Sequence, residues 1–347
     1  MRWLEGEVRA NAGWQERGKS QKGIQRVKAV VCTRYGPPEV LRVEDVPMPV
    51  PRRNQVRIRV VATAVTSSDC YVRGLNLPAR YRVAARLALG LTGPRRRILG
   101  MVLAGEVESA GADVTAFGPG DQVFGFDRHV FGTYAEYVCW PQDTVLAAMP
   151  GGLTYEEAAA IPYGGLLALH FLRRAGVRGG QRVAVYGASG AVGTSAVQLA
   201  RHFGADVTGV CSGANLELVR SLGASTVIDY TTDDFTHKQR PYDIIFDAVG
   251  KRKSSAALRQ AGRALTPGGI RISVDDGTPK LLTSDLTVLE QLAGTKVIRP
   301  VIDRCYRLEQ MAEAHRYVDS GHKKGNVVVT VSTLARTDRA ASPARGR

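Results

Sequence analysis

The residue types best suited to chemistry lie in a glycine-rich segment between an apolar run, 182–187, and a stretch with helical spacing, 191–203. A turn between a strand and a helix presents free backbone N–H groups and the positive end of the helix dipole to an anion. Alone, this pattern also fits a tight turn that binds nothing, but the strand before it and the helix after it favour a dinucleotide site. We predict that seven residues cradle the pyrophosphate: Gly187, Ala188, Ser189, Gly190, Ala191, Val192 and Gly193.

Three positions of this turn carry specific expectations. Gly190 lets the phosphate approach the backbone, and Gly193 lets the helix pack on the strand. Ala188 stands where the first glycine of the pattern G-x-G-x-x-G is usual, and a residue this small is expected to be tolerated there.

The end of the next strand, 206–211, indicates which dinucleotide is bound. It reaches Cys211 and Ser212 without an acidic residue, whereas an acid there would hold the ribose 2′-hydroxyl of NAD. This favours NADPH, although residues 213–215 supply no basic partner for a 2′-phosphate and NADH stays possible. Tyr230, at the end of the third strand, is expected either to flank the adenine or to be a surface tyrosine.

The elements that must position this turn alternate between strand and helix, which indicates a parallel sheet covered by helices. The expected strands span 182–187, 206–211, 226–229, 242–248 and 269–274, and the expected helices span 155–174, 191–203, 214–222 and 254–265.

Residues 28–148 are different, because short apolar or alternating runs are separated there by glycine and proline. This pattern is typical of a compact β-rich domain. Its expected strands span 28–33, 55–64, 102–109 and 134–138; after the α/β part, a strand at 296–302, a helix at 308–320 and a strand at 326–331 remain.

The composition is that of a globular protein and excludes the disordered, collagen-like and membrane classes. The chain has 347 residues, of which 44% are hydrophobic and 23% charged, enough for two domains with sizeable cores. No apolar run approaches the roughly 18 residues that cross a bilayer, and the N-terminus lacks a signal-peptide stretch. We therefore expect a cytoplasmic protein with reduced thiols, since the five cysteines include no C-x-x-C pair.

The formal net charge of +15 raises the possibility of nucleic-acid binding. However, residues 1–26 hold six basic and three acidic residues, and residues 333–347 hold four basic residues and one acidic residue, so the tails carry much of the excess. Nucleic acid is thus possible but not favoured as a partner. A further arginine cluster is expected to be a solvated face or, alternatively, to meet an anionic ligand: Arg80, Arg82, Arg86, Arg95, Arg96 and Arg97.

Eight short motifs follow one another in a fixed order, at 28–30, 69–74, 99–105, 120–125, 158–162, 187–193, 223–230 and 246–250. Together they resemble the medium-chain dehydrogenase/reductase superfamily, and within it the zinc-independent quinone oxidoreductase branch that includes the zeta-crystallin-like proteins. The resemblance covers nearly the whole chain between the tails. Val249, in the last motif, is expected to contact the cofactor.

The resemblance implies an α/β fold with a GroES-like β-rich substrate domain, 27–150, and a Rossmann domain with a doubly wound parallel sheet, 151–295, separated by a cleft. Residues 296–332 would return to the substrate domain. Residues 1–26 are expected to be a disordered extension or a start upstream of the true one, and residues 333–347 a disordered tail. The resemblance also implies a homodimer.

Zinc is not expected, because the ligands of zinc-dependent relatives are replaced. Thr66 stands where such relatives carry a cysteine, and Gly100, Met101 and Val102 stand where they carry Gly-His-Glu. The cysteine-rich lobe that holds their structural zinc is missing as well. Threonine, methionine and valine do not supply the N, S and O ligands that zinc needs.

Without a Lewis acid, reduction of an already activated acceptor is easier than oxidation of a simple alcohol. We therefore expect hydride transfer from NADPH to a small-molecule quinone, enone or similar carbonyl acceptor. Tyr71 matches the tyrosine that the resemblance places beside the substrate carbonyl, although it could equally be a packed tyrosine. Thr66 replaces an asparagine common in quinone reductases and is a second candidate donor.

Two alternatives remain open at this point. The chain could be an NAD(P)-dependent alcohol dehydrogenase or aldehyde reductase. It could also be an NADPH-binding protein with little turnover, of a crystallin-like or RNA-binding kind.

Overall fold

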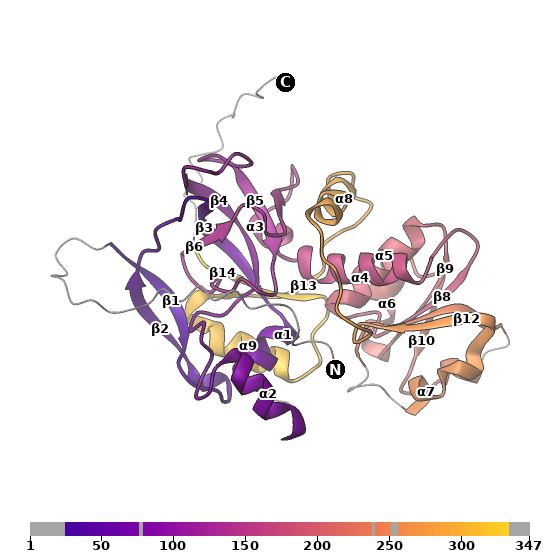
Figure 1. Cartoon of the computed structure of the whole chain (residues 1–347). Helices are drawn as coiled ribbons and strands as arrows, with labels where there is room; N and C mark the ends of the chain where they lie inside the picture. Colours follow the sequence, from indigo (N-terminus) through magenta and orange to yellow (C-terminus); the bar gives the residue numbers. More distant parts are fainter. Residues whose placement is uncertain (1–24, 76–78, 238–239, 251–255, 333–347) are drawn as a thin grey trace.

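The computed structural model describes residues 25–75, 79–237, 240–250 and 256–332. They form two parts that lie side by side in Figure 1, one built mainly on antiparallel strands and the other on a parallel sheet. The α/β fold class with these two kinds of sheet is confirmed. No helix within the described ranges is both long enough and apolar enough to cross a membrane.

The parallel sheet contains five strands in the order β10-β9-β8-β11-β12, and each neighbouring pair runs parallel. The chain moves outward from β8 to β10 and then returns to the other side of β8, which makes the β8–β11 gap the switch point of a doubly wound sheet. The strands are β8 (Arg182–Tyr186), β9 (Asp206–Cys211), β10 (Thr226–Asp229), β11 (Tyr242–Asp247) and β12 (Leu265–Ser273).

Most helical segments of this part, including its 3-10 turns, cover the parallel sheet or connect its strands (Figure 1). The segments are α3 (Tyr155–Ala159), α4 (Pro162–Arg174), α5 (Ala191–His202), η2 (Gly213–Asn215), α6 (Leu216–Ser221), η3 (Phe235–His237), α7 (Ala256–Arg259), η4 (Ala261–Ala264) and α8 (Thr283–Gly294). The first of them packs instead against the sheet of the other part, and the last also contacts that sheet.

The other part contains a seven-stranded sheet and a two-stranded antiparallel ribbon. The last strand of the chain enters the seven-stranded sheet beside β3, so this sheet combines early and late residues (Figure 1). Its strands are β3 (Gln55–Val65), β4 (Val102–Ala110), β5 (Gln122–Phe126), β6 (Tyr137–Pro141), β7 (Leu146–Ala148), β13 (Ile302–Arg307) and β14 (Asn326–Thr330); the ribbon is β1 (Arg26–Cys32) with β2 (Leu41–Pro47). Its helical segments are η1 (Pro38–Val40), α1 (Ser67–Gly74), α2 (Ala79–Leu89), η5 (Leu308–Gln310) and α9 (Met311–Asp319).

A continuous apolar core joins the two sheets through helix α4. Phe124 and Phe126 of β5 belong to the same buried cluster as Leu166 of α4 and Val185 of β8. Burial of these apolar side chains stabilises the packing of each sheet against α4. This packing also fixes the orientation of the parallel sheet, and so of the carboxyl ends of its strands, relative to the seven-stranded sheet.

Several expected elements differ in the structure. The single helix expected over 155–174 is two helices, since Pro162 starts a new helix and cannot extend the preceding one. The strand expected over 134–138 begins at Tyr137, and only a bridge between Ala29 and Ala135 precedes it. The helix expected over 254–265 is short, and Leu265 already begins β12.

The strand predicted over 296–302 is wrong. Helix α8, which the sequence analysis missed, ends there in a left-handed turn: Lys296 has a φ of 60°, and the N–H of Val297 donates to the carbonyl of Leu292. This is a Schellman-type helix end, in which the backbone N–H groups that follow the helix donate to carbonyls of its last turn. These N–H groups are therefore not available for hydrogen bonds to a neighbouring strand. The strand β13 starts only at Ile302.

The expectations for residues 1–24 and 333–347 lie outside the described residues, whereas Arg26 belongs to β1. The domain limits stay predictions.

A buried polar network holds α1 against α9, which lie side by side in Figure 1. Arg73 of α1, only 1% exposed, donates from Nη2 to Asp319 (2.7 Å) and from Nη1 to Nδ1 of His315 (3.2 Å). Because a guanidinium only donates, Nδ1 accepts and the ring proton is on Nε2, 3.2 Å from the hydroxyl oxygen of Tyr134. Tyr134 in turn faces the buried carboxyl group of Asp69, whose charge adds to burial in raising the pKa of Tyr134.

We expect Arg73→Ala to lower the free energy of unfolding by about 3 kcal/mol or more, because it leaves a carboxylate and an imidazole without their buried partner. Urea unfolding followed by circular dichroism measures the change. The matched control is Arg53→Ala, since the Arg53 side chain is 77% exposed and its pair with Asp113 lies in solvent, where screening by water leaves an ion pair little effect on stability. Equal losses in the two variants would contradict a special role for Arg73.

The network also predicts a pH dependence of stability. Burial, helped by the charge of Arg73, lowers the pKa of His315 from 6.5 to about 3, so the folded protein keeps the ring neutral while the unfolded chain binds a proton. This contribution is fully present above about pH 6.5 and decreases by about 1.4 kcal/mol for each pH unit below it, until the folded ring also protonates.

We therefore expect wild type to lose about 2 kcal/mol more than His315→Gln between about pH 7.5 and 5 in urea unfolding. Asp69 acts with the opposite sign, since burial raises its pKa to about 6, but it is present in both proteins and cancels in the comparison. An identical pH profile for the two proteins would show that His315 is not the group that titrates.

Candidate functional site

The glycine-rich turn lies at the carboxyl end of β8, beside the switch point of the sheet. The N–H of Gly187 donates to the carbonyl of Val210 (2.9 Å), and the N–H of Gly190 closes the turn on the carbonyl of Gly187 (3.0 Å). The first bond of α5 runs from Thr194 to Gly190. Helix geometry therefore leaves the N–H groups of residues 191–193 without acceptors inside the helix, and these groups are available to an anion.

The three glycines of the turn are required for three different reasons. Gly187 has a φ of +77°, and a Cβ there would lie 2.3 Å from Cγ2 of Val249. A Cβ on Gly193 would lie 2.0 Å from the carbonyl oxygen of Gly187, so only glycine lets α5 approach the turn. A Cβ on Gly190 would lie 3.5 Å from the carbonyl oxygen of Gly187, an ordinary contact, so this side of the turn has an open face that a phosphate group fits.

Two of the residues predicted to bind cofactor face the core instead. The methyl group of Ala188 is fully buried and packs opposite Gly209, and its N–H donates to Val210. Cys211 is also buried, and burial raises the pKa of its thiol to about 11. Neither side chain is oriented toward a ligand; these positions shape the turn through their backbone.

The structure connects the turn to the end of β9 through Asn215, which the sequence analysis did not select. Its side-chain nitrogen donates to the hydroxyl of Ser189 (3.1 Å) and to that of Ser212 (3.0 Å). Its side-chain oxygen is buried and has no hydrogen-bond partner among the described residues. The sequence carries no signal for this bridge, because the contact between Asn215 and Ser189 joins two separate loops.

The predicted ribose end of the site also carries a carboxylate that the sequence did not single out. Asp229, at the end of β10, lies so close to Gly213 that a Cβ on that glycine would be 2.4 Å from its oxygen. Hydrogen bonds from Thr231 lower the pKa of Asp229 and keep it charged. The end of β9, which carries no acid of its own, therefore lies beside a carboxylate of the neighbouring strand. Tyr230 is 48% exposed, and its ring lies 6.0 Å from that of Tyr186.

Val249 lies in a loop that a buried carboxylate fixes at the end of β11. One oxygen of Asp247 accepts from the N–H groups of Val249 (3.0 Å) and Gly250 (2.9 Å), and the other accepts from the hydroxyl of Ser273 at the end of β12 (3.1 Å). The loop is thereby held against Gly187, so the predicted contact Val249 borders the turn.

The C-terminal segment closes the other side of the turn. The N–H of Gly325 donates to the carbonyl of Ser189 (2.7 Å), and the two glycines Gly190 and Gly325 form a parallel bridge. Half-buried Lys323 donates to the carbonyl of Gly325 (2.6 Å). The strand β14 thus enters the seven-stranded sheet directly from the candidate cofactor site.

The candidate catalytic residues lie on and before α1. Thr66 caps this helix: its hydroxyl donates to Asp69 (2.7 Å) and accepts from the N–H of the same residue (3.2 Å). The predicted role of Thr66 as a donor to substrate would require this hydroxyl to leave its partner. Tyr71 is half-buried on α1 and stays a candidate.

Helix α4 brings the turn and α1 together. A Cβ on Gly164 would lie 2.2 Å from the carbonyl oxygen of Ala191, the first residue of α5. The adjacent Tyr163 has its hydroxyl 3.3 Å from the hydroxyls of both Ser67 and Ser68, the first two residues of α1. We call Ser67, Ser68 and Tyr163 the hydroxyl cluster. It spans the junction of the two sheets beside the glycine-rich turn.

The residues at the position of the zinc site in related folds do not fit that metal. Thr66 is a helix cap, and Met101 and Val102 are buried apolar side chains. Within the described residues, no group of three or more His, Cys, Asp or Glu side chains is arranged to hold a metal ion. We therefore derive no chemical step through zinc.

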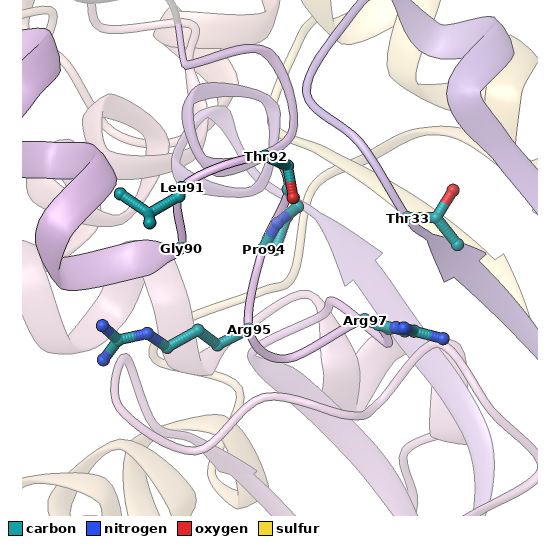
Figure 2. Close-up of a pocket in the computed structure, with 8 residues that line it drawn as sticks. Thr33, Gly90, Leu91, Thr92, Pro94, Arg95 and Arg97 are labelled. Carbon is teal, nitrogen blue, oxygen red and sulfur yellow. The ribbon is translucent and has the colours of Figure 1, made fainter.

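Part of the arginine cluster lines a separate pocket of about 390 Å³, shown in Figure 2. The pocket lies between Thr33 and the loop 90–97 and contains no residue of the glycine-rich turn. Arg95, Arg96 and Arg97 are exposed, and Arg95 donates to the carbonyl of Leu87 (2.8 Å). This agrees with the solvated face that the sequence favoured.

Comparisons with known proteins match both parts of the chain. A model described as alcohol dehydrogenase GroES-like domain matches residues 52–151, and one described as zinc-binding dehydrogenase matches residues 222–329. A 2-methylene-furan-3-one reductase of Solanum lycopersicum is 31% identical over 326 residues, which cover 87% of this chain and 79% of that protein. An NADPH-dependent alkenal/one oxidoreductase of the Arabidopsis thaliana chloroplast is 30% identical, with 88% and 80% covered. The structure of a quinone oxidoreductase from Coxiella burnetii aligns with a TM-score of 0.79 and 29% identity, covering 89% of this chain and all of that one.

Substitutions of Gly190 and of Gly193 should have different effects. We expect Gly193→Ala to destabilise the fold by about 1–3 kcal/mol, because its methyl group would overlap the backbone of the turn. Gly190→Ala should fold normally but bind NADPH at least about 10-fold more weakly, since its methyl group occupies the open face. Thermal unfolding and fluorescence titration with NADPH measure the two effects. Normal NADPH binding by folded Gly190→Ala would contradict the placement of the cofactor.

Proposed function

The chain belongs to the quinone oxidoreductase branch of the medium-chain dehydrogenase/reductase superfamily, and from this membership we propose that it is an oxidoreductase that uses NADPH to reduce quinones or conjugated enones. The observation that carries the proposal is the glycine-rich turn held directly beside the hydroxyl cluster and α1. Relatives named as a quinone oxidoreductase and as an NADPH-dependent alkenal/one oxidoreductase support the same chemistry.

The residues that would hold the cofactor fit a dinucleotide. The N–H groups of residues 191–193 would bind the pyrophosphate over the open face of Gly190, and Ser212 and Asn215 would border the ribose. Asp229 beside Gly213 reduces the advantage of a 2′-phosphate, so we propose NADPH as cofactor with NADH accepted as well. When bound, the dihydronicotinamide supplies a hydride.

The protein's own contribution is to orient the acceptor and to stabilise the negative charge on its oxygen. Tyr71, half-buried on α1, is the proposed donor carried over from the sequence. A neutral phenol suits this task, because it donates a hydrogen bond without adding a charge that must be desolvated.

Quinones and enones suit such a site because their conjugated systems accept a hydride without a metal. A simple ketone needs stronger polarisation of its carbonyl, which zinc supplies in metal-dependent enzymes. The donor set around Thr66 does not fit zinc, so the alcohol dehydrogenase alternative is not favoured.

Other expectations from the sequence stay predictions. They are the homodimer, the cytoplasmic location and the minor role of nucleic acid. The alternative of a cofactor-binding protein with little turnover differs from our proposal only in activity, and the assay below separates the two.

We expect the purified protein to oxidise NADPH with a panel of small quinones and enones, with or without a chelator. Tyr71→Phe should lower kcat/KM by about 10-fold or more, because the donor to the acceptor oxygen is lost. The control is Tyr137→Phe, since Tyr137 lies on β6 beside the opposite end of β3. Chelator-sensitive oxidation of simple alcohols would support the dehydrogenase alternative, and NADPH binding without turnover would support the binding protein.

A further inference from the structure

The hydroxyl cluster places a tyrosine of the cofactor-binding part within reach of the substrate part. Tyr163 lies in the first turn of α4, and its hydroxyl oxygen is 3.3 Å from those of Ser67 and Ser68. Its ring packs edge-on against Phe126, with ring centroids 5.3 Å apart and planes at 86°. The ring contact and the two serines together orient the hydroxyl of Tyr163 toward the start of α1.

Whether the hydroxyl of Tyr163 can donate to a further group depends on which hydroxyls donate within the cluster. Each serine has one O–H group, and both can donate to the oxygen of Tyr163. Their hydrogen bonds favour the phenolate, but burial outweighs them and raises the pKa of Tyr163, so the group stays neutral and keeps its proton. When both serines donate to its oxygen, the O–H of Tyr163 is left to donate to a further partner.

The side chains around Tyr163 leave its hydroxyl accessible to a small molecule bound beside α1 and the glycine-rich turn. Ser67, Ser68, Tyr71 and Tyr163 are all half-buried, so their side chains are partly accessible. Tyr71 follows the two serines by three and four residues, which places it on the same face of α1, and it is close enough to influence the pKa of Tyr163. The adjacent Gly164 contacts the start of α5 at the glycine-rich turn.

We propose that Tyr163, oriented by Ser67 and Ser68, donates a hydrogen bond to the carbonyl oxygen of the quinone or enone acceptor. This inference rests on the proposed function and adds to it a catalytic residue from the cofactor-binding part. The two serines are positioning residues, because they act through Tyr163. Tyr71 then contacts the acceptor from the α1 side.

Bound NADPH would supply the hydride and its two electrons: a C–H bond of the dihydronicotinamide would break, a bond to hydrogen would form at the acceptor, and NADP⁺ would remain. The negative charge would then be delocalised onto the acceptor oxygen. Tyr163 stabilises this charge by its hydrogen bond and retains its own proton. A proton from water then completes the reduced product.

Steady-state kinetics with one quinone and one enone test the proposal. We expect Tyr163→Phe to lower kcat by about 10- to 100-fold, with the dissociation constant of NADPH unchanged, because the donor acts on charge that develops in the transition state. Ser67→Ala/Ser68→Ala should lower kcat by about 5-fold, since the tyrosine remains but is less well oriented. Tyr137→Phe is the control for a half-buried tyrosine outside the cluster.

A spectroscopic measurement tests the hydrogen bond without turnover. The probe is 4-nitrophenol bound in the presence of NADP⁺, because its neutral and ionised forms absorb at different wavelengths. A donor at the oxygen lowers the pKa of the bound phenol, so wild type should hold more of it ionised than Tyr163→Phe, and the double serine variant should lie between them.

The outcomes separate this inference from the function on which it rests. Active wild type with an equally active Tyr163→Phe variant, or with unchanged 4-nitrophenol ionisation in that variant, would overturn the role of Tyr163 and leave the proposed function standing. Wild type that binds NADPH but reduces neither acceptor would overturn both.

Discussion

The candidate site depends most on the hydrogen bonds of the buried Arg73 guanidinium. A charge in this position is costly unless it is paired and fully hydrogen-bonded, and here its partners are Asp319 and His315 on α9. These bonds therefore tie α9 to α1, the helix that carries Tyr71. Because Arg73 cannot accept a proton, it also sets the tautomer of His315 and, through it, the orientation of the hydroxyl of Tyr134.

The same C-terminal segment reaches the cofactor side. Between α9 and β14 the chain passes Gly325, which bonds to the glycine-rich turn. One segment thus connects α1, the seven-stranded sheet and the turn on the parallel sheet. On the opposite side, α4 makes a second connection through Gly164 and Tyr163. Two independent bridges position the cofactor turn relative to the residues proposed to contact the acceptor, a condition for precise orientation of reacting groups.

The polar side chains at this junction are neutral hydroxyls. Asp69 is buried behind them and bonded to the cap residue Thr66, and the charges of Arg73 and Asp319 compensate each other. Such a site can orient a carbonyl and stabilise a delocalised charge, but it offers little to a substrate that needs strong polarisation. A site of neutral hydroxyls therefore favours acceptors that are already conjugated over simple alcohols and ketones.

Local signals in the sequence were sufficient for the class of fold and for the position of the glycine-rich turn. Alternating strands and helices, and glycines at 187, 190 and 193, depend on short-range geometry, since a strand-to-helix turn needs small residues wherever it occurs. The same reasoning failed for residues 296–302. An apolar run does not show whether its backbone N–H groups donate to a neighbouring strand or, as here, to the last turn of the preceding helix.

The tertiary structure decided which side chains act together. Asn215 joins two loops, Asp229 reaches the ribose end from a neighbouring strand, and Tyr163 meets Ser67 across 96 positions of sequence. Nothing in the local pattern around any of these residues specifies its partner. The sequence by itself determined that this chain forms a doubly wound sheet with a glycine-rich turn after the first strand of that sheet. Which hydroxyls lie together near that turn was decided by long-range packing, which brings distant segments together only when the whole core forms.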